Sequence, residues 1–509
     1  MKNKNIFIFA MFMLTGVATR FLFLGLRPVH HDEGMLAYFA WELSEGRGYI
    51  YTPQIHGPIL FYLQAVLFKI FGTGDNILRG STAIFGVVLA GLPFLYRKAL
   101  THKKAIAISA LVISSPILTY FARFLVHTSL VIVINFVIVL NLWLFVKKPK
   151  TIYLYIFAIS LALAFGISET SYIFISIIIL FVIFCYLVER RLFLAKLKDI
   201  KVFLGRNYLD LISAFLLFVL SWILIYSAGL TSPKSFLLSL PNPFNPQGGL
   251  GFWLAQHQNK LGGQPWFYYL LLFVVYEPLT FLGTIFAAIE SARRRGGFLQ
   301  CFSVFLAFTS LIGYSIAGEK FPWLILPTLV LFVISAGLYF GRNYNKSAFI
   351  IKFFIIALLI FTLFNTYRLN FINPGDTKEL ITYVQTPNSF KEVITEVISN
   401  CEGVGSECVM IDSDISWPLS WEFKKISFLD YLDNVNTIKP KTKYIFANSD
   451  KAGKISKNDF FSRRILLRDW WVPPVCRKLE CAKTYLRYFV SRTIWGTKGG
   501  YEIMLLERK

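Results

Sequence analysis

Long apolar runs with almost no charge dominate this 509-residue chain and constrain its fold more than any other feature. Each run approaches the ~20 residues that a helix needs to cross about 30 Å of hydrocarbon. Hydrophobic residues make up 55% of the chain and the mean hydropathy is +0.56, whereas a soluble domain usually has about 45–50% apolar residues. We therefore predict a mainly α polytopic membrane protein. Its eleven expected transmembrane helices lie at about 5–26, 79–97, 105–122, 125–146, 151–168, 170–188, 208–228, 266–288, 299–317, 321–341 and 348–368.

The basic residues predict how these helices are oriented. Lys plus Arg number 52 and Asp plus Glu 29, which gives a formal net charge of +23. No nucleic-acid-binding motif accompanies the excess, so we expect no nucleic-acid partner. The basic clusters lie at alternate turns, and the positive-inside rule then places the N-terminus in the cytoplasm and the C-terminus outside the plasma membrane. These clusters are Lys2 and Lys4, Arg97 to Lys104, Lys147 to Lys150, Arg190 to Lys201, Arg293 to Arg295, and Arg342 with Lys346. An anionic lipid-phosphate substrate would also favour cations near the bilayer surface.

Two long external loops are expected in the membrane part of the chain. The first runs from about 27 to 78 and contains an amphipathic helix over 33–45. It also contains the apolar segment 56–71, which is short for a crossing and includes Pro58 and Lys69, so we interpret it as a juxtamembrane helix. The second loop, 231–265, is rich in Pro, Asn and Gly and shows few signals of regular structure.

The composition changes at about residue 371, where charges become dense and the apolar runs stop. We therefore divide the chain into a transmembrane domain, 1–370, and a small extracytoplasmic α/β domain, 371–509. Strands are expected in "KELITYVQT" (378–386), "ECVMIDSD" (407–414) and "KTKYIFANS" (441–449), and a helix at 389–399.

Four cysteines fall in the predicted outer domain as two close pairs. Disulfides 401–408 and 476–481 suit an oxidising compartment. Free thiols are an alternative. A zinc site is disfavoured because neither pair has the C-x-x-C form and no His lies in this domain. Cys185 and Cys301 lie within expected spans.

The stretch "HHDEG" follows directly after the first apolar run. Asp32 could be an N-cap, whose side-chain oxygen accepts a backbone N–H at the start of the helix. It could equally be a general base, since an ionised Asp accepts a proton from an attacking hydroxyl and a helix N-terminus favours the ionised forms of Asp32 and Glu33. The adjacent His30 and His31 offer metal-ligand chemistry, but neighbouring residues of a helix point apart and a zinc spacing is missing. We predict no metal ligands here.

Three other expected outer turns carry residues with chemistry. Arg123 and His127 are spaced i, i+4 and can share a helix face. Arg123 could reach the membrane surface with an apolar stem, or bind a phosphate through its guanidinium. Glu169 lies in a tight turn where a carboxylate is readily solvated. Lys320 in "AGEKFPWLILP" could anchor a helix end or contact a lipid phosphate, next to Glu319 and Trp323. Because all these segments are expected on the outer side, we predict one shared external site.

The position of Asp32 and Glu33 resembles the mark of the GT-C superfamily of multi-span glycosyltransferases, an Asp or Asp-Glu just after the first span. This superfamily includes protein O-mannosyltransferases, lipid A aminoarabinose transferases and oligosaccharyltransferases. A closer resemblance is to the prokaryotic membrane family called flippase activity-associated protein. Similar segments are "HHDEG" (30–34), "HGP" (56–58), "GEKxPWL" (318–324), "NPGD…YVQT" from Asn373, "WPLxW" (417–421), "RDWWVP" (468–473) and "WGTKGGYE" (495–502). One departure is "ARFLVHTSL", which has His127 and Thr128 where related enzymes often have an acidic residue.

The resemblance implies an inverting transfer of a sugar from a polyprenyl- or dolichyl-phosphate donor to a glycan, lipid or protein acceptor. Asp32 would be the general base, and Glu33 would orient the acceptor or the sugar. Substrate-binding residues would be His31, His56, Arg123, His127, Glu169, Glu319, Lys320 and Trp323. No cofactor is expected, and a divalent metal ion is the alternative. The alternatives are a flippase for lipid-linked saccharide and a non-catalytic accessory factor of surface glycosylation.

Overall fold

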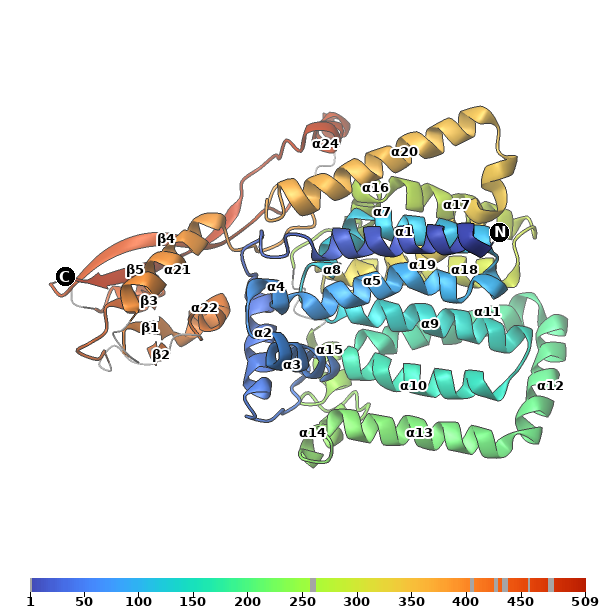
Figure 1. Ribbon diagram of the computed structural model, residues 1–509, viewed down its shortest axis with the longest axis horizontal. Coiled ribbons are helices and arrows are strands. Elements are labelled where there is room, and N and C mark those ends of the chain that lie inside the picture. Colours follow the sequence, from blue (N-terminus) through green and yellow to red (C-terminus); the bar gives the residue numbers. More distant parts are fainter. Residues whose placement is uncertain are drawn as a thin grey trace. The chain divides into compact units, whose positions relative to one another are not determined.

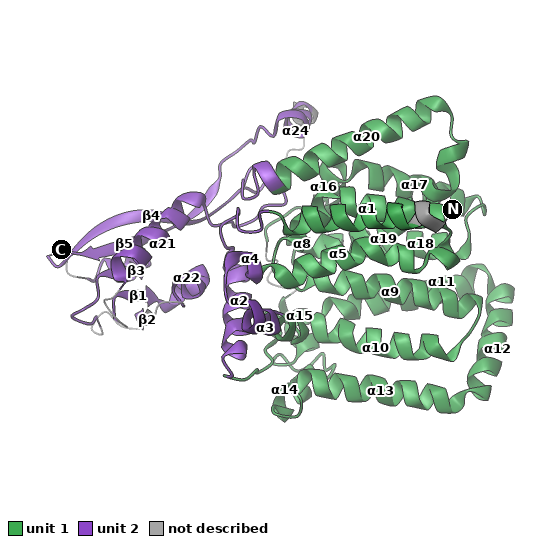
Figure 2. Ribbon diagram, in the orientation of Figure 1, with its two compact units in different colours: residues 1–22, 47–63, 79–370 green, residues 23–46, 64–78, 371–509 purple. Residues whose placement is uncertain are grey.

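The computed structural model describes residues 2–256, 262–402, 407–424, 429–432, 438–455, 458–474 and 480–509. The chain divides into two compact units, which Figure 2 colours separately. Unit 1 comprises residues 1–22, 47–63 and 79–370, and unit 2 comprises residues 23–46, 64–78 and 371–509. Unit 2 therefore combines the C-terminal region with two segments of the predicted first external loop. The predicted division at residue 370 places these two segments in the transmembrane domain.

Unit 1 consists of helices, because an apolar segment in hydrocarbon must satisfy its backbone hydrogen bonds internally. Among the described residues, six helical stretches are long and apolar enough to cross a membrane. They are α9 (Thr128–Lys147), α11 (Thr170–Val188), α13 (Tyr208–Tyr226), α18 (Phe298–Ile316), Pro322–Lys346 with α19 (Leu326–Asn343), and Phe349–Ile372 with α20 (Phe349–Tyr367).

Two further pairs of helices pass the same test only together, because each pair is bent at a break (Figure 1). The angle is 66° between α7 (His102–Ser114) and α8 (Pro116–Ala122), and 109° between α16 (Tyr268–Tyr276) and α17 (Pro278–Ala292). A proline opens the second helix of each pair, at a position where its missing N–H removes no helical hydrogen bond.

The two breaks meet at a buried carboxylate. Glu277, between α16 and α17, accepts hydrogen bonds from the Ser115 hydroxyl at 2.5 Å and from the Ile117 N–H at 3.2 Å. Glu277, which is distant in sequence, therefore accepts hydrogen bonds from donors at the start of α8. This is the end of a helix at which the dipole favours negative charge.

Shorter apolar helices occupy the three remaining predicted spans. They are α1 (Lys2–Phe21, apolar from Ile6), α5 (Gly80–Leu95) and α10 (Thr151–Ile167). A helix thus lies at each of the eleven predicted positions, although only six to eight of them meet the full-length test. The prediction of a mainly α polytopic membrane protein with a small C-terminal sheet region is confirmed.

The connections of unit 1 contain further helices. α12 (Arg190–Arg206) has no buried residue and carries basic and apolar side chains, and Figure 1 shows it crossing the ends of α11 and α13. Such a helix is typical of a membrane surface. α6 (Arg97–Leu100) joins α5 to α7. The loop 231–265 is more regular than the sequence indicated, because α14 (Pro233–Ser239) and α15 (Gly249–Gln256) form in it.

Unit 2 contains a five-stranded sheet in the order β2-β1-β3-β5-β4. Its strands are β1 (Val409–Asp412), β2 (Leu429–Leu432), β3 (Tyr444–Ala447), β4 (Phe460–Trp470) and β5 (Gly499–Arg508). β1 is parallel to β2 and β3, and β5 is antiparallel to β3 and β4. Both faces are covered, since Val409 and Ile411 belong to one core cluster and the intervening Met410 to another.

Helices of unit 2 come from both ends of the chain. Its C-terminal part has α21 (Asn388–Cys401), α22 (Ser416–Phe423), α23 (Ser449–Ala452) and α24 (Glu480–Ser491). Its N-terminal segments have α2 (His31–Ser44), α4 (Asp75–Leu78) and the end of α3 (Ile59–Phe71). α2 packs on α22: a Cβ on Gly34 would lie 2.9 Å from that of Pro418, and the Tyr38 ring lies 5.4 Å from the Trp417 ring.

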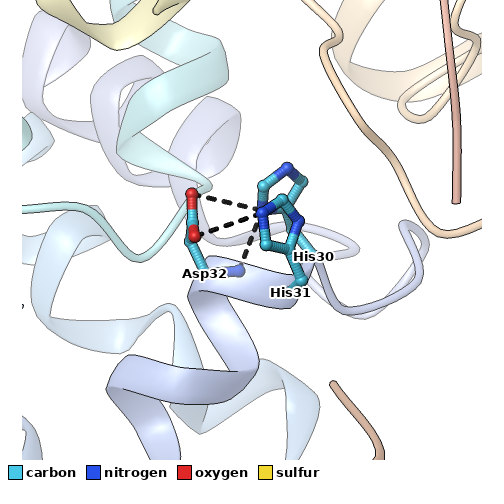
Figure 3. A group of neighbouring side chains, drawn as sticks. All are labelled: His30, His31 and Asp32. Carbon is cyan, nitrogen blue, oxygen red and sulfur yellow. Dashed lines mark hydrogen bonds and ion pairs between the residues drawn. The ribbon is translucent and has the colours of Figure 1, made fainter. Parts of the chain in front are cut away.

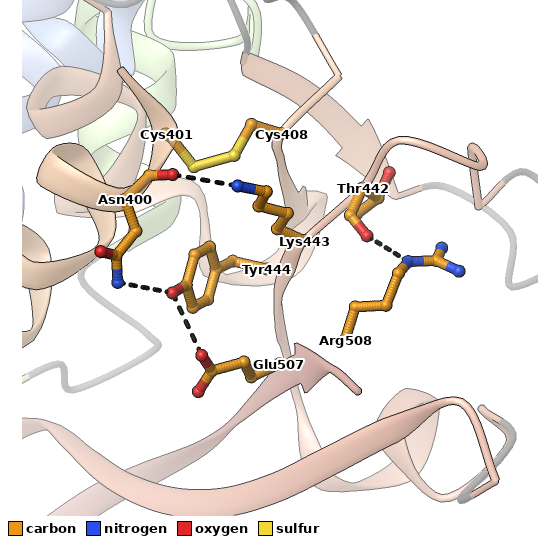
Figure 4. Close-up of a disulfide and its surroundings, with 8 residues drawn as sticks. All are labelled: Asn400, Cys401, Cys408, Thr442, Lys443, Tyr444, Glu507 and Arg508. Atoms are coloured by element: carbon orange, nitrogen blue, oxygen red, sulfur yellow. Dashed lines mark hydrogen bonds between the residues drawn. A yellow bond between two sulfur atoms is a disulfide. The ribbon is translucent and has the colours of Figure 1, made fainter. Parts of the chain in front are cut away.

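The predicted strands and cysteines of this region are only partly correct. The strands within 407–414 and 441–449 and the helix at 389–399 are confirmed. The predicted strand 378–386 is wrong, because the adjacent Leu380 and Ile381 are both buried and only Gln385 forms a β-bridge, to Asp469. Cys401 and Cys408 form the predicted disulfide (Figure 4). The second predicted disulfide, 476–481, cannot be followed because Cys476 lies outside the described residues.

Candidate functional site

The start of α2 is a capping box built around a histidine. His30 is the N-cap: its Nδ1 accepts the Asp32 N–H at 3.1 Å, and its own N–H donates to Glu33 Oε2 at 3.2 Å. Glu33 is fully buried and also pairs with Arg27 at 3.2 Å. Asp32 is therefore not the N-cap, so its carboxylate is not used to satisfy the end of the helix.

The second nitrogen of the His30 ring is also engaged. Nε2 lies 2.9 Å from the Tyr383 carbonyl oxygen, and because a carbonyl only accepts, Nε2 carries the hydrogen and Nδ1 is the acceptor. Burial lowers the pKa of His30 to about 3, with a smaller contribution from His31. Burial and the nearby Arg468 likewise lower the pKa of His31 to about 3. Both rings are therefore neutral at neutral pH.

Asp32 has the exposed carboxylate of this cluster (Figure 3). Its side chain is 30% exposed; Oδ1 lies 3.3 Å from His31 Nε2 and Oδ2 lies 3.8 Å from His30 Nδ1. An ionised, partly exposed carboxylate beside two neutral rings can accept a proton from a bound hydroxyl.

The same three side chains come closer than the sequence indicated. One ligand atom each of His30, His31 and Asp32 lies within 4.8 Å of the others. Both nitrogens of His30, however, are taken by the Asp32 N–H and the Tyr383 carbonyl. A metal ion would therefore find two ligands in this arrangement, His31 and Asp32, unless the helix cap opened, and most protein metal sites need three or four.

Sequence reasoning missed two residues that surround this cluster. Arg468 interacts electrostatically with both Asp32 and His31, and its side chain donates to the Trp417 carbonyl. It stands in β4 beside a register shift in the pairing with β5, and such bulges turn a side chain away from the regular alternation. Tyr383 binds His30 through its backbone, which no side-chain pattern could reveal.

A second group of predicted residues lies together in unit 1. His56 Nδ1 is 2.7 Å from Glu169 Oε2, and the Tyr51 hydroxyl donates to Glu169 Oε1 at 2.7 Å. The His56 ring stacks on Trp253 of α15 at 4.7 Å and meets the His127 ring edge-on at 4.9 Å. His127 is buried, which lowers its pKa well below the ordinary value. A neutral ring cannot supply a positive charge to a phosphate.

The guanidinium of Arg123 has a structural task. Its Nη1 donates to the carbonyls of Thr19 at 3.2 Å and Leu22 at 2.6 Å, where α1 ends. The side chain is largely buried. A cation at a helix C-terminus satisfies carbonyls that lack a helical partner and complements the dipole.

The segment 317–323 lies beside the same part of unit 1. The Trp323 ring lies 6.0 Å from Phe124 and stacks on Phe321 at 4.8 Å. Lys320 is buried and its Nζ donates to the Ala317 carbonyl; burial lowers its pKa. Glu319 is partly exposed.

Unit 1 thus brings together three of the four predicted outer segments and the His56 part of the first loop. His31, Asp32 and Glu33 belong to unit 2, with Arg468 and Tyr383.

Comparison with known proteins identifies the fold. The crystal structure of ArnT from Cupriavidus metallidurans bound to undecaprenyl phosphate matches with a TM-score of 0.61, over 98% of this chain and 97% of that chain, at 13% sequence identity. The apo structure of the same protein matches with a TM-score of 0.59 over the same shares, at 12% identity. No protein-family model and no curated protein sequence matches the chain. The fold implied by the resemblance to the GT-C superfamily is therefore confirmed.

Proposed function

We propose that this integral membrane protein transfers a sugar from a polyprenyl- or dolichyl-phosphate donor to an acceptor hydroxyl, with inversion at the anomeric carbon. The observation that carries the proposal is the shared fold over nearly the whole chain with a protein whose structure holds undecaprenyl phosphate. The exposed carboxylate of Asp32, at the position that marks the superfamily, supports it.

In this reaction Asp32 is the general base. It takes the proton of the acceptor hydroxyl as the oxygen forms a bond to the anomeric carbon. The bond from that carbon to the phosphate oxygen breaks, and its electron pair leaves with the lipid phosphate. A single displacement of this kind inverts the configuration.

The neighbours of Asp32 position it rather than react. Neutral His30 holds the first turn of α2, and the buried pair of Glu33 and Arg27 fixes the chain that enters the helix. We assign Glu33 this positioning role in place of direct contact with sugar. Arg468 is a cation that interacts with Asp32, so it suits the phosphate or the sugar hydroxyls.

The remaining predicted substrate contacts stay proposals. They are His31, His56, His127, Glu169, Glu319, Lys320 and Trp323, with Arg123 acting through the end of α1. We also propose that the N-terminus is cytoplasmic and that unit 2 is extracytoplasmic. The Cys401–Cys408 disulfide supports an oxidising environment around unit 2. The basic residues of α12 support a cytoplasmic location for the connection between α11 and α13.

We propose that transfer needs no metal ion, because the cap at His30 leaves the cluster with two ligands. Purified protein is given radiolabelled lipid-phosphate sugars and acceptors in the presence of EDTA. We expect product of inverted configuration, which Asp32→Asn forms at least about 10³-fold more slowly. Full activity of that variant would exclude Asp32 as the base, and a loss with EDTA that Mg²⁺, Mn²⁺ or Zn²⁺ restores would overturn metal independence.

A flippase remains a second candidate because of one observation. Two bent helix pairs meet at buried Glu277, and broken helices with an ionisable residue are features of transporters. Proteoliposomes with fluorescent lipid-linked saccharide test it. Movement across the bilayer by wild type but not by Glu277→Gln, with no sugar transferred, would favour the flippase over the enzyme.

A further inference from the structure

Glu169 is fully engaged by two side chains of the first external loop. Oε1 accepts the Tyr51 hydroxyl and Oε2 faces His56 Nδ1, both at 2.7 Å. The carboxylate is 6% exposed and Tyr51 is buried. A carboxylate with both oxygens occupied and little open surface is better suited to orient His56 than to bind a sugar.

This contact determines which nitrogen of His56 can react. Because Nδ1 donates to the carboxylate, Nε2 is the nitrogen that gains or loses a proton. The His56 side chain is 25% exposed, in contrast to Glu169. An imidazole with one nitrogen held by a buried carboxylate and the other accessible is the arrangement of a proton-transfer group.

The backbone holds His56 in a strained conformation. Its φ is 62°, a left-handed value that a residue with a side chain rarely adopts. The next residue, Gly57, lies so close to the Gly166 carbonyl that a side chain would not fit. The Trp253 ring lies parallel to the imidazole, with an angle of 7° between the planes. Strain of this kind persists only where the surroundings fix it, and it is concentrated at functional sites.

The charges around the ring suit a protonated imidazole. Among the described residues, the titratable groups in contact with His56 are Glu169, His127 and Tyr49, and Tyr51 contacts Glu169. His127 is kept neutral by burial, and burial together with Glu169 raises the pKa of Tyr49 and Tyr51, so these phenols are neutral as well. Glu169 therefore compensates the charge that the ring takes up when Nε2 binds a proton.

We propose that His56, oriented by Glu169, donates the Nε2 proton to the phosphate of the lipid carrier as the sugar leaves. This inference rests on the proposed transfer reaction. The bond from the anomeric carbon to the phosphate oxygen breaks, the phosphate keeps the electron pair, and one of its oxygens takes the proton. Neutral His56 regains a proton from water, while the acceptor proton leaves through Asp32. The phosphate that leaves is a monoester dianion, which readily accepts one proton.

The acid role of His56 must be distinguished from a purely structural role, because its contact with Glu169 also connects the first loop to the turn between α10 and α11. The pH profile of transfer separates the two roles. An acid must be protonated, so the wild-type rate should fall as the pH rises above neutrality. His56→Gln should lose this alkaline limb and be about 10²-fold slower or more. Glu169→Gln keeps an acceptor for Nδ1–H but removes the charge that supports the imidazolium, so its limb should move to lower pH.

A glycine variant keeps the proposal testable if these variants unfold. His56→Gly tolerates the positive φ, and added imidazole should restore its transfer rate at low pH more than at high pH. His102→Gln, which changes a histidine outside the group, is the matched control and should keep the wild-type profile.

The outcomes separate this proposal from the proposed function. The acid role alone would be rejected if Asp32→Asn loses transfer but His56→Gln keeps the wild-type decrease in rate at high pH. It would also be rejected if Glu169→Gln shows that decrease at the same pH as wild type. Rescue of His56→Gly that is independent of pH would also reject it. Wild-type protein that transfers no sugar would overturn both.

Discussion

Each unit contains a histidine beside a carboxylate, and the two arrangements are opposite. In unit 2 the His30 ring is buried and both of its nitrogens are bonded, whereas the Asp32 carboxylate is 30% exposed. In unit 1 the Glu169 carboxylate is 6% exposed and both of its oxygens are bonded, whereas the His56 side chain is 25% exposed.

The comparison shows that residue type alone does not assign a role. The buried partner has a contact at each ring nitrogen or carboxylate oxygen and little open surface, so it is suited to orienting its neighbour. The exposed partner retains an atom that can exchange a proton. On this basis we propose that Asp32 and His56 react, while His30 and Glu169 position them.

The largest expected effect comes from removing the reactive carboxylate. Asp32→Asn should lower the transfer rate by about 10³-fold or more, because a general base contributes about 10²–10⁴ and the amide cannot accept the proton. The melting temperature should stay near that of wild type, since Asp32 does not cap the helix. Glu45→Gln, a change at the other end of α2, is the control and should leave the rate unchanged.

A large loss of stability is expected at the neighbouring residue. Glu33→Gln removes the negative charge from the buried pair with Arg27 and should lower the free energy of unfolding of unit 2 by about 3 kcal/mol. Denaturant unfolding monitored in unit 2 measures this. If Glu33 instead contacts substrate, the variant should lose transfer at unchanged stability.

The pH dependence of stability tests the buried histidine. Because the pKa of His30 falls to about 3 in the folded protein, the unfolded chain binds the proton more readily below about pH 6.5. The free energy of unfolding should therefore decrease on acidification from pH 6.5 towards 3, by at most about 1.4 kcal/mol per pH unit for this group. His30→Asn keeps a good N-cap and should show a flatter profile. An equally steep profile in the variant would assign the dependence to other groups.

The smallest effect is expected at the group that holds Glu169 from the other side. Tyr51→Phe removes one hydrogen bond to a charged acceptor and should destabilise unit 1 by about 1.5–3 kcal/mol. If Glu169 acts only by orienting His56, transfer should decrease less than in Glu169→Gln. A greater decrease would show that the tyrosine itself takes part.

The helices could be predicted from the sequence because a long apolar run in a membrane has one main way to satisfy its backbone. The details of the candidate site could not. Asp32 has the usual chemistry of an N-cap, yet His30 takes that position because it can also bond to Tyr383, far along the chain. Arg123 fits a phosphate equally well, but its Nη1 donates to the carbonyls of Thr19 and Leu22, where α1 ends. In both cases contacts distant in sequence decided between local alternatives.

The pairing of α2 with α22 has a consequence for the order in which the chain is made. Residues 31–44 leave the ribosome early, and residues 416–423 almost last. The surface on which the Asp32 helix rests therefore does not exist for most of synthesis. Until the last fifth of the chain emerges, the helix that carries Asp32 lacks its packing partner α22. A chain truncated before α22 should therefore insert into the membrane but transfer no sugar.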